Sequence, residues 1–154
     1  MISLITSITE VDTAKRYTVG TIAQLKNGNE YIYLPGTPNV AKYNVCSFGS
    51  ACAAMSYGSV ALLNINEIGC VGIAQGAIIQ NTWGWFQIKG LAWASCDAVL
   101  SAGTILFSSG TLGYLTNAKT AGDAIMGMIN LATSAAGTVR VSLNYPFVSN
   151  TFIN

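Results

Sequence analysis

The stretch that decides the fold is a run of aromatic, aliphatic and glycine residues in the middle of the chain: Trp83-Gly84-Trp85-Phe86-Gln87-Ile88-Lys89-Gly90. Large side chains at almost every position indicate a β-strand, in which successive side chains point to opposite faces. Trp83 and Trp85 then share one face with two polar residues, whereas Phe86 and Ile88 share the other. We predict that Phe86 and Ile88 lie in a hydrophobic core and that the other face meets something else.

The composition predicts one domain whose surface is largely covered by other protein. The chain has 154 residues, of which 51% are apolar and only 8% are charged. An ordinary soluble domain carries about 25% charged residues. No run of about 18 apolar residues is present, and the N-terminus lacks the basic start and apolar run of a signal peptide. We therefore expect synthesis and retention in a cytoplasm, no membrane contact, and burial in an assembly.

The residue types that most catalytic sites need are missing or scattered. The chain contains no histidine, which excludes Ser-His-Asp and Cys-His nucleophiles as well as histidine metal ligands. No local motif brings together the pair of carboxylates that a glycosidase uses. The net charge of +1, without a basic run, argues against nucleic-acid binding. We expect a protein that is not an enzyme and that uses no cofactor or metal.

The cysteines also argue against a metal site. The chain has four of them, at Cys46, Cys52, Cys70 and Cys96. Their spacings contain no C-x-x-C pair, which a zinc site would favour. We predict that they serve as small buried hydrophobic residues.

The N-terminal residues 1–14 are predicted to form an extended arm. The arm carries four large aliphatic residues, Ile2, Leu4, Ile5 and Ile8. This apolar content is too high for a solvated tail, so we predict that the arm docks on a partner or a neighbouring subunit. A β domain is assigned to residues 15–147, and a short C-terminal tail to residues 148–154.

Alternation and turn signals predict an all-β fold of short hairpins with little helix. Asn27-Gly28 favours a type I′ turn, because glycine and asparagine tolerate positive φ. The predicted strands cover residues 17–25, 30–34, 104–108, 112–116, 124–131 and 138–144. Tyr145-Pro146-Phe147 is expected to end the last strand, since proline cannot donate to the ladder. The only candidate helix covers residues 51–57. This pattern is typical of a small single-domain β-barrel or sandwich.

The aromatic residues leave two interpretations open. Trp83, Trp85 and Trp93, together with Tyr31 and Tyr33, could stack on sugar rings in a glycan-binding module or fibre-tip domain. Aromatic residues also bury area in cores and between subunits. The low charge favours the second interpretation, in which Trp83 and Trp85 face a neighbouring subunit or another protein partner.

Several of these segments resemble a known family. Gly84-Trp85-Phe86-Gln87-Ile88-Lys89-Gly90 is similar to a Gly-Trp-Val-Gln-Val-x-Gly strand that recurs in the capsid decoration, or cement, proteins of tailed bacteriophages. The likeness extends over residues 15–147. Its other segments are Gly20-Thr21-Ile22, Glu30-Tyr31-Ile32-Tyr33-Leu34, Ala102-Gly103-Thr104, Ile125-Met126-Gly127 and Gly137-Thr138-Val139-Arg140-Val141-Ser142-Leu143-Asn144. The residues 46–70, rich in alanine and cysteine, and the N-terminal arm depart from the family pattern.

The resemblance implies a structural protein of the virion. Decoration proteins fold as small β-barrels of a β-tulip-like kind, commonly form trimers, and bind the outer surface of the icosahedral head where capsomers meet. The expected partners are the major capsid protein and further copies of the same chain. The candidate interface residues are Ile2, Leu4, Ile5, Ile8, Trp83 and Trp85.

Overall fold

The chain is all-β, as the sequence predicts. The computed structural model describes residues 7–36, 39–49, 60–63, 69–119 and 124–149, and these residues contain no helix. Their ten strands are β1 (Ile22–Gln24), β2 (Glu30–Pro35), β3 (Val45–Phe48), β4 (Val60–Leu62), β5 (Gly69–Ala74), β6 (Trp83–Cys96), β7 (Phe107–Ser108), β8 (Leu115–Thr116), β9 (Ala124–Asn130) and β10 (Gly137–Ser149). The candidate helix at residues 51–57 lies outside the described residues.

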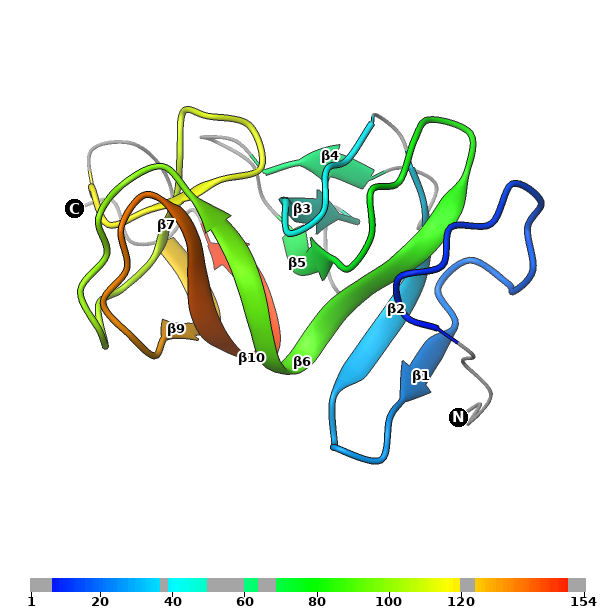
Figure 1. The fold of residues 1–154 in the computed structure, drawn as a ribbon, viewed down its shortest axis with the longest axis horizontal. Coiled ribbons are helices and arrows are strands. Elements are labelled where there is room, and N and C mark those ends of the chain that lie inside the picture. Colours follow the sequence, from blue (N-terminus) through cyan, green and yellow to red (C-terminus); the bar gives the residue numbers. More distant parts are fainter. Residues whose placement is uncertain (1–6, 37–38, 50–59, 64–68, 120–123, 150–154) are drawn as a thin grey trace.

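All ten strands belong to one sheet that is organised around β6. The strand order is β1-β2-β6-β8-β7-β9-β10-β5-β3-β4, with additional pairings of β6 to β10 and to β5. The pairings from β6 through β8, β7, β9 and β10 return to β6 and so form a closed circuit. Figure 1 shows β6 as a long bent strand, with β1 and β2 beside one half and β9 and β10 beside the other.

The bend in β6 occurs at Gly90, which has a φ of +93°. A Cβ at this position would overlap Oδ1 of Asn29, in the turn between β1 and β2. Up to Lys89 the strand β6 pairs with β2 and β5, and from Lys89 onward it pairs with β10. Phe86 and Ile88 lie in one hydrophobic cluster before the bend, as predicted, and Ala92 lies in a second cluster after it. Trp85 lies in a third cluster, so this one strand supplies side chains to three hydrophobic clusters.

The predicted alternation is confirmed in β2 and β10. Tyr31 and Ile32 are both buried but belong to different clusters, on opposite faces of β2. In β10, Val139 and Val141 are 1% and 0% exposed, whereas Arg140 between them is exposed. Period-two patterning therefore places these side chains correctly.

The first hairpin forms where predicted but with a different turn. The amide of Gly28 donates to the carbonyl of Leu25 at 3.0 Å, and the amide of Leu25 donates to the carbonyl of Asn29 at 2.9 Å. Within this turn only Gly28 has a positive φ, of +83°. A type I turn followed by a glycine bulge has this pattern, so the prediction of a type I′ turn is wrong. The first strand is shorter than predicted, because a turn from Thr18 to Thr21 precedes it.

The last strand is longer than predicted. β10 continues through Pro146 to residue 149, with a register shift against β9 between Leu143 and Phe147. Tyr145 within this bulge has a φ of +48°. A bulge accommodates proline because it interrupts the hydrogen-bond ladder. Val148 is 4% exposed and belongs to the core, so the expected tail boundary at residue 148 is wrong.

The described part of the N-terminal arm packs on its own domain. The backbone of Asp12 exchanges two hydrogen bonds with Trp83, at 2.8 and 3.0 Å. The hydroxyl of Tyr33 donates to Oδ2 of Asp12 at 2.7 Å, and Val11 packs against a core cluster. These contacts place residues 11 and 12 in the folded domain rather than in a free arm.

The cysteines differ in state. Cys46 and Cys96 are free and buried, as predicted, and burial raises the pKa of the Cys46 thiol far above its usual range. An apolar setting of this kind makes a thiol unreactive. Cys70 is disulfide-bonded, which corrects the prediction that all four cysteines are simple hydrophobic residues. Cys52 lies outside the described residues.

The Gly90→Ala substitution tests the bend. We expect it to lower the free energy of unfolding by about 1–3 kcal/mol, because an L side chain is strained at this φ and would also displace Asn29. Urea unfolding monitored by tryptophan fluorescence measures the change. Gly103→Ala is the matched control, because Gly103 has a φ of +74° but open space around it. If both variants lost the same free energy of unfolding, the close approach of Asn29 to Gly90 would make no contribution to the effect of Gly90→Ala.

Candidate functional site

Trp85 does not face a partner. It is 3% exposed and packs with Tyr17 and Tyr33, whose ring centroids lie 5.3 and 5.1 Å from its own. The prediction that Trp85 contacts a neighbouring subunit is therefore wrong, because the first hairpin and the N-terminal segment cover this face of β6. Trp83 is half-buried at the edge of the same cluster, and its contact with a partner stays a prediction.

The arm residues are only partly described. Ile8 is half-buried and packs against the cluster around Trp85 within its own chain, and its contact with a partner stays a prediction. Ile2, Leu4 and Ile5 lie outside the described residues. The structure thus brings the three described candidates, Ile8, Trp83 and Trp85, together in one cluster within the domain.

A different apolar surface lies over β9 and its neighbours. Five large hydrophobic residues are solvent-exposed there, and we call them the β9 patch: Ile105, Met126, Ile129, Leu131 and Phe147. Their exposed fractions run from 36% for Met126 to 64% for Ile105. Phe147 lies directly opposite Met126 in the pairing of β10 with β9, so strand register brings them together. Large apolar groups gathered in this way mark surfaces that other proteins cover.

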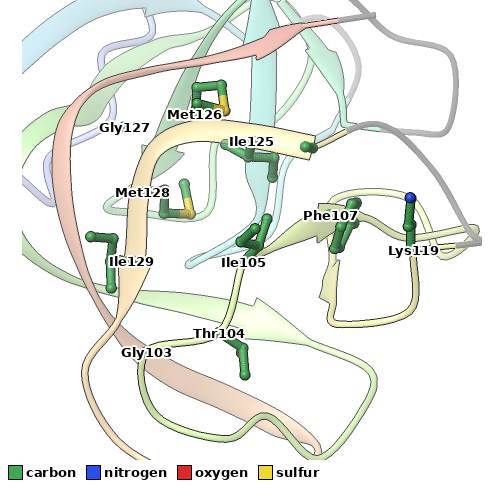
Figure 2. Close-up of a pocket in the computed structure, with 11 residues that line it drawn as sticks. Gly103, Thr104, Ile105, Phe107, Lys119, Ile125, Met126, Gly127, Met128 and Ile129 are labelled. Carbon is green, nitrogen blue, oxygen red and sulfur yellow. The ribbon is translucent and has the colours of Figure 1, made fainter. Parts of the chain in front are cut away.

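A groove of about 670 Å³ runs alongside β9 (Figure 2). The segment leading into β7 meets β9 through two backbone hydrogen bonds, from Ile125 to Leu106 at 2.9 Å and from Gly103 to Asn130 at 3.0 Å. Apolar side chains line most of the groove, and Ile105 enters it from that segment. Lys119 is the one charged lining residue among the described positions. The groove therefore suits apolar side chains of a partner better than a polar metabolite.

A buried carboxylate joins three distant parts of the chain. Glu30 is 6% exposed, and its Oε1 lies 2.9 Å from Nζ of Lys89 and 3.2 Å from Nε2 of Gln24. The hydroxyl of Tyr145 donates to Oε2 of the same carboxylate. We call these four residues the Glu30 cluster. They connect β1, β2, β6 and β10 close to the bend at Gly90.

The Glu30 cluster keeps its carboxylate ionised. The hydrogen bond from Tyr145 has the largest effect and lowers the pKa of Glu30, while burial opposes it and Lys89 lowers it further. The same contacts raise the pKa of Lys89. A carboxylate held in this state is suited to a structural ion pair rather than to donating a proton at neutral pH. Sequence reasoning missed the cluster, because residues 30, 89 and 145 share no local motif.

The remaining polar groups form no recognisable catalytic set. Ser109 donates a hydrogen bond to Asp97, while Glu10 and Asp12 pair with Arg16 at 3.1 and 3.9 Å. Within the described ranges no group of three or more histidine, cysteine or acidic residues is placed to hold a metal ion. No helix of sufficient length and apolar character to cross a membrane occurs in the described part of the chain.

Comparisons with known proteins assign no family to this chain. No family model matches it, and no curated protein is significantly similar to it.

Glu30→Gln tests the Glu30 cluster through its pH dependence. Because the folded-state pKa of Glu30 is lowered, its stabilising contribution is fully present above the unfolded pKa of about 4.3 and is lost as the pH falls through the folded pKa. We expect the variant to be less stable than the wild type at pH 7 and the difference to narrow below pH 4. Chemical unfolding at a series of pH values measures this difference.

Glu10→Gln is the matched control, because Glu10 forms an ion pair with Arg16 at the protein surface. It should change stability little at any pH, since exposed pairs contribute little. If the free energy of unfolding of Glu30→Gln were lower than that of the wild type by the same amount at every pH, this would contradict the assignment of an ionised Glu30.

Proposed function

We propose that this protein is a capsid decoration protein of a tailed bacteriophage, which binds the outer surface of the icosahedral head at capsomer junctions and stabilises it. The observation that carries the proposal is the β9 patch with its adjoining groove, on a chain with only seven basic and six acidic residues. The likeness of residues 84–90 to the decoration-protein strand supports the same function. The protein would act by binding and would catalyse no reaction.

The chemistry of the β9 patch favours a protein partner. Interface cores are depleted in charged residues and enriched in methionine and aromatic residues, and the patch combines Met126 and Phe147 with three aliphatic residues. A standard interface buries about 800 Å² on each partner. A chain that contacts both the shell and its own copies would cover several such areas, so it needs few charged residues to stay soluble.

We favour a homotrimer as the binding unit. Several copies around a capsomer junction engage the shell at once, and the second and later contacts then form at high effective concentration. Weak individual contacts thus add to a durable attachment without requiring a large single interface. The major capsid protein supplies the other side of each contact.

The disulfide at Cys70 is compatible with this location. Disulfides persist in oxidising surroundings, which include virion surfaces, and are rare in proteins that remain in a reducing cytoplasm. A protein that is assembled in the reducing host cytoplasm and then carried on the outside of the released virion is later exposed to oxidising surroundings, where a disulfide persists.

Substitution of Ile129 by glutamate tests the β9 patch. We expect the purified wild type to run as a homo-oligomer in size-exclusion chromatography with light scattering, and Ile129→Glu to shift toward monomer or to lose binding to purified heads. Ile79→Glu is the matched control, because Ile79 is 58% exposed and Ile129 is 56% exposed, and Ile79 lies outside the patch. A monomeric wild type that does not bind heads would exclude the proposed function.

Deletion of residues 1–6 tests the arm separately from the folded domain. The deletion spares Asp12, whose hydrogen bonds to Trp83 hold the described arm on the sheet. We expect an unchanged thermal unfolding midpoint and weaker attachment to heads of the phage that encodes the chain, measured by cosedimentation. Attachment equal to that of the full chain would remove Ile2, Leu4 and Ile5 from the interface.

A further inference from the structure

A second groove, with several polar side chains in its lining, spans the bend in β6, because Gln87 lines it before Gly90 and Leu91 and Trp93 line it after Gly90. It has a volume of about 320 Å³, which is at the small end of ligand sites. Its described lining contains no carboxylate and one cation, that of Lys42. Its lining includes Tyr31, Lys42, Tyr43, Gln75, Gln87 and Trp93. We call this site the polar groove.

Two buried amides in the polar groove have unused hydrogen-bonding capacity. Nε2 of Gln87 donates to the carbonyls of Lys89 and Leu91 at 3.1 and 3.0 Å, and Nε2 of Gln75 donates to the carbonyl of Ile73 at 3.0 Å. These carbonyls fix which end of each amide is the donor. Neither Oε1 receives a hydrogen bond from the described residues, although Gln75 is only 8% exposed and Gln87 only 1%.

Buried polar atoms almost always have a partner, so two unmatched acceptors lining one groove point to a bound group that donates hydrogen bonds. Tyr31 adds a third polar group at the same place. Its hydroxyl accepts a hydrogen bond from Asn29 at 3.3 Å, and Tyr31 itself is 1% exposed. A ligand with several hydroxyl groups matches this set, because each hydroxyl both donates and accepts.

Tyr43, which lines the groove, has a backbone conformation that tyrosine rarely adopts. Its φ is 71°, and two backbone hydrogen bonds hold it there: its amide donates to Ala74 and its carbonyl accepts from Ser95, both at 2.9 Å. Such strain in a residue other than glycine is concentrated at binding sites. Nζ of Lys42 lies 4.8 Å from the centre of the Tyr43 ring, and both residues line the groove.

Trp93, which also lines the groove, provides an apolar platform. It is 44% exposed, in contrast to Trp85, which is 3% exposed. Arg140 lies 5.7 Å from the centre of the Trp93 ring and helps to position it. A sugar ring presents C–H groups on its flat side and hydroxyl groups around its edge. An exposed indole can pack against the flat side, while amide acceptors beside it can accept hydrogen bonds from the hydroxyl groups.

We infer that the polar groove is a carbohydrate-binding site, in which a pyranose ring stacks on Trp93 and its hydroxyls hydrogen-bond to Gln75, Gln87 and Tyr31. Of the five aromatic residues that the sequence offers for sugar stacking, Trp93 and Tyr31 line this groove, whereas Trp83, Trp85 and Tyr33 do not line it and pack in the cluster around Trp85, to which Tyr31 also belongs. Since the lining lacks carboxylates and contains Lys42, the groove accepts neutral and acidic sugars. The inference does not depend on attachment to a capsid.

Ligand-observed NMR by saturation transfer tests this site with a fixed panel of probes. The panel contains the methyl glycosides of glucose, galactose, N-acetylglucosamine and glucuronic acid, with cellobiose and lactose as short saccharides. We expect saturation of ring protons in at least one probe with the wild-type protein. We expect Trp93→Ala to weaken binding of that probe roughly tenfold, as loss of an aromatic contact predicts.

Phe147→Ala is the matched control, because Phe147 is 41% exposed but belongs to the β9 patch and not to the polar groove. It should leave sugar binding unchanged. Gln75→Met keeps the side-chain length and removes the amide, so it should weaken sugar binding; because it also removes the hydrogen bond from Nε2 to the carbonyl of Ile73, the thermal unfolding midpoint of the variant is measured alongside to verify that it folds. The inference is overturned if no probe in the panel is saturated by the wild type, or if Trp93→Ala and Phe147→Ala bind equally well. Head attachment measured on the same variants separates this outcome from failure of the proposed function.

Discussion

The absence of a side chain at Gly90 is the constraint on which the rest of the structure depends. Its left-handed backbone redirects β6, so that the strand pairs with β2 and β5 up to Lys89 and with β10 from Lys89 onward. The space where a Cβ would lie is occupied by Asn29. Three hydrophobic clusters, the Glu30 cluster and the polar groove all involve β6 residues on one or both sides of this bend. A straight strand would not bring them together.

Local patterning predicts much of this fold, because burial repeats with the period of a strand. The inward positions of β10 and the opposite faces of β2 follow from alternation alone. Alternation separates the two faces of a strand but does not say what covers each of them. Alternation therefore places Trp85 on the face away from Phe86, but it does not reveal that the first hairpin of the same chain covers that face. The end of β10 was misplaced for a related reason, since Pro146 fits within a bulge whose existence depends on the pairing with β9.

The candidate sites were less predictable than the fold. The β9 patch follows from strand register and from the segment before β7, and neither is visible as a motif. The Glu30 cluster joins residues far apart in sequence, so only the topology identifies it. Trp93 was recognised as an aromatic residue that could contact sugar, but its companions in the groove, Gln75 and Gln87, carry no sequence signal. Their importance arises from burial combined with unmatched acceptor atoms.

β10 comes last of the ten strands in sequence but pairs in the middle of the sheet, and this order affects when the sheet can form. β10 pairs with β5, β6 and β9, and its Tyr145 closes the cluster around a glutamate 115 residues earlier. Contacts between such distant residues form slowly and only after the intervening chain has been made. During translation the edges of β5, β6 and β9 that pair with β10 therefore stay unpaired until β10 has left the ribosome. A chain so poor in charge is then most vulnerable to aggregation before its synthesis is complete.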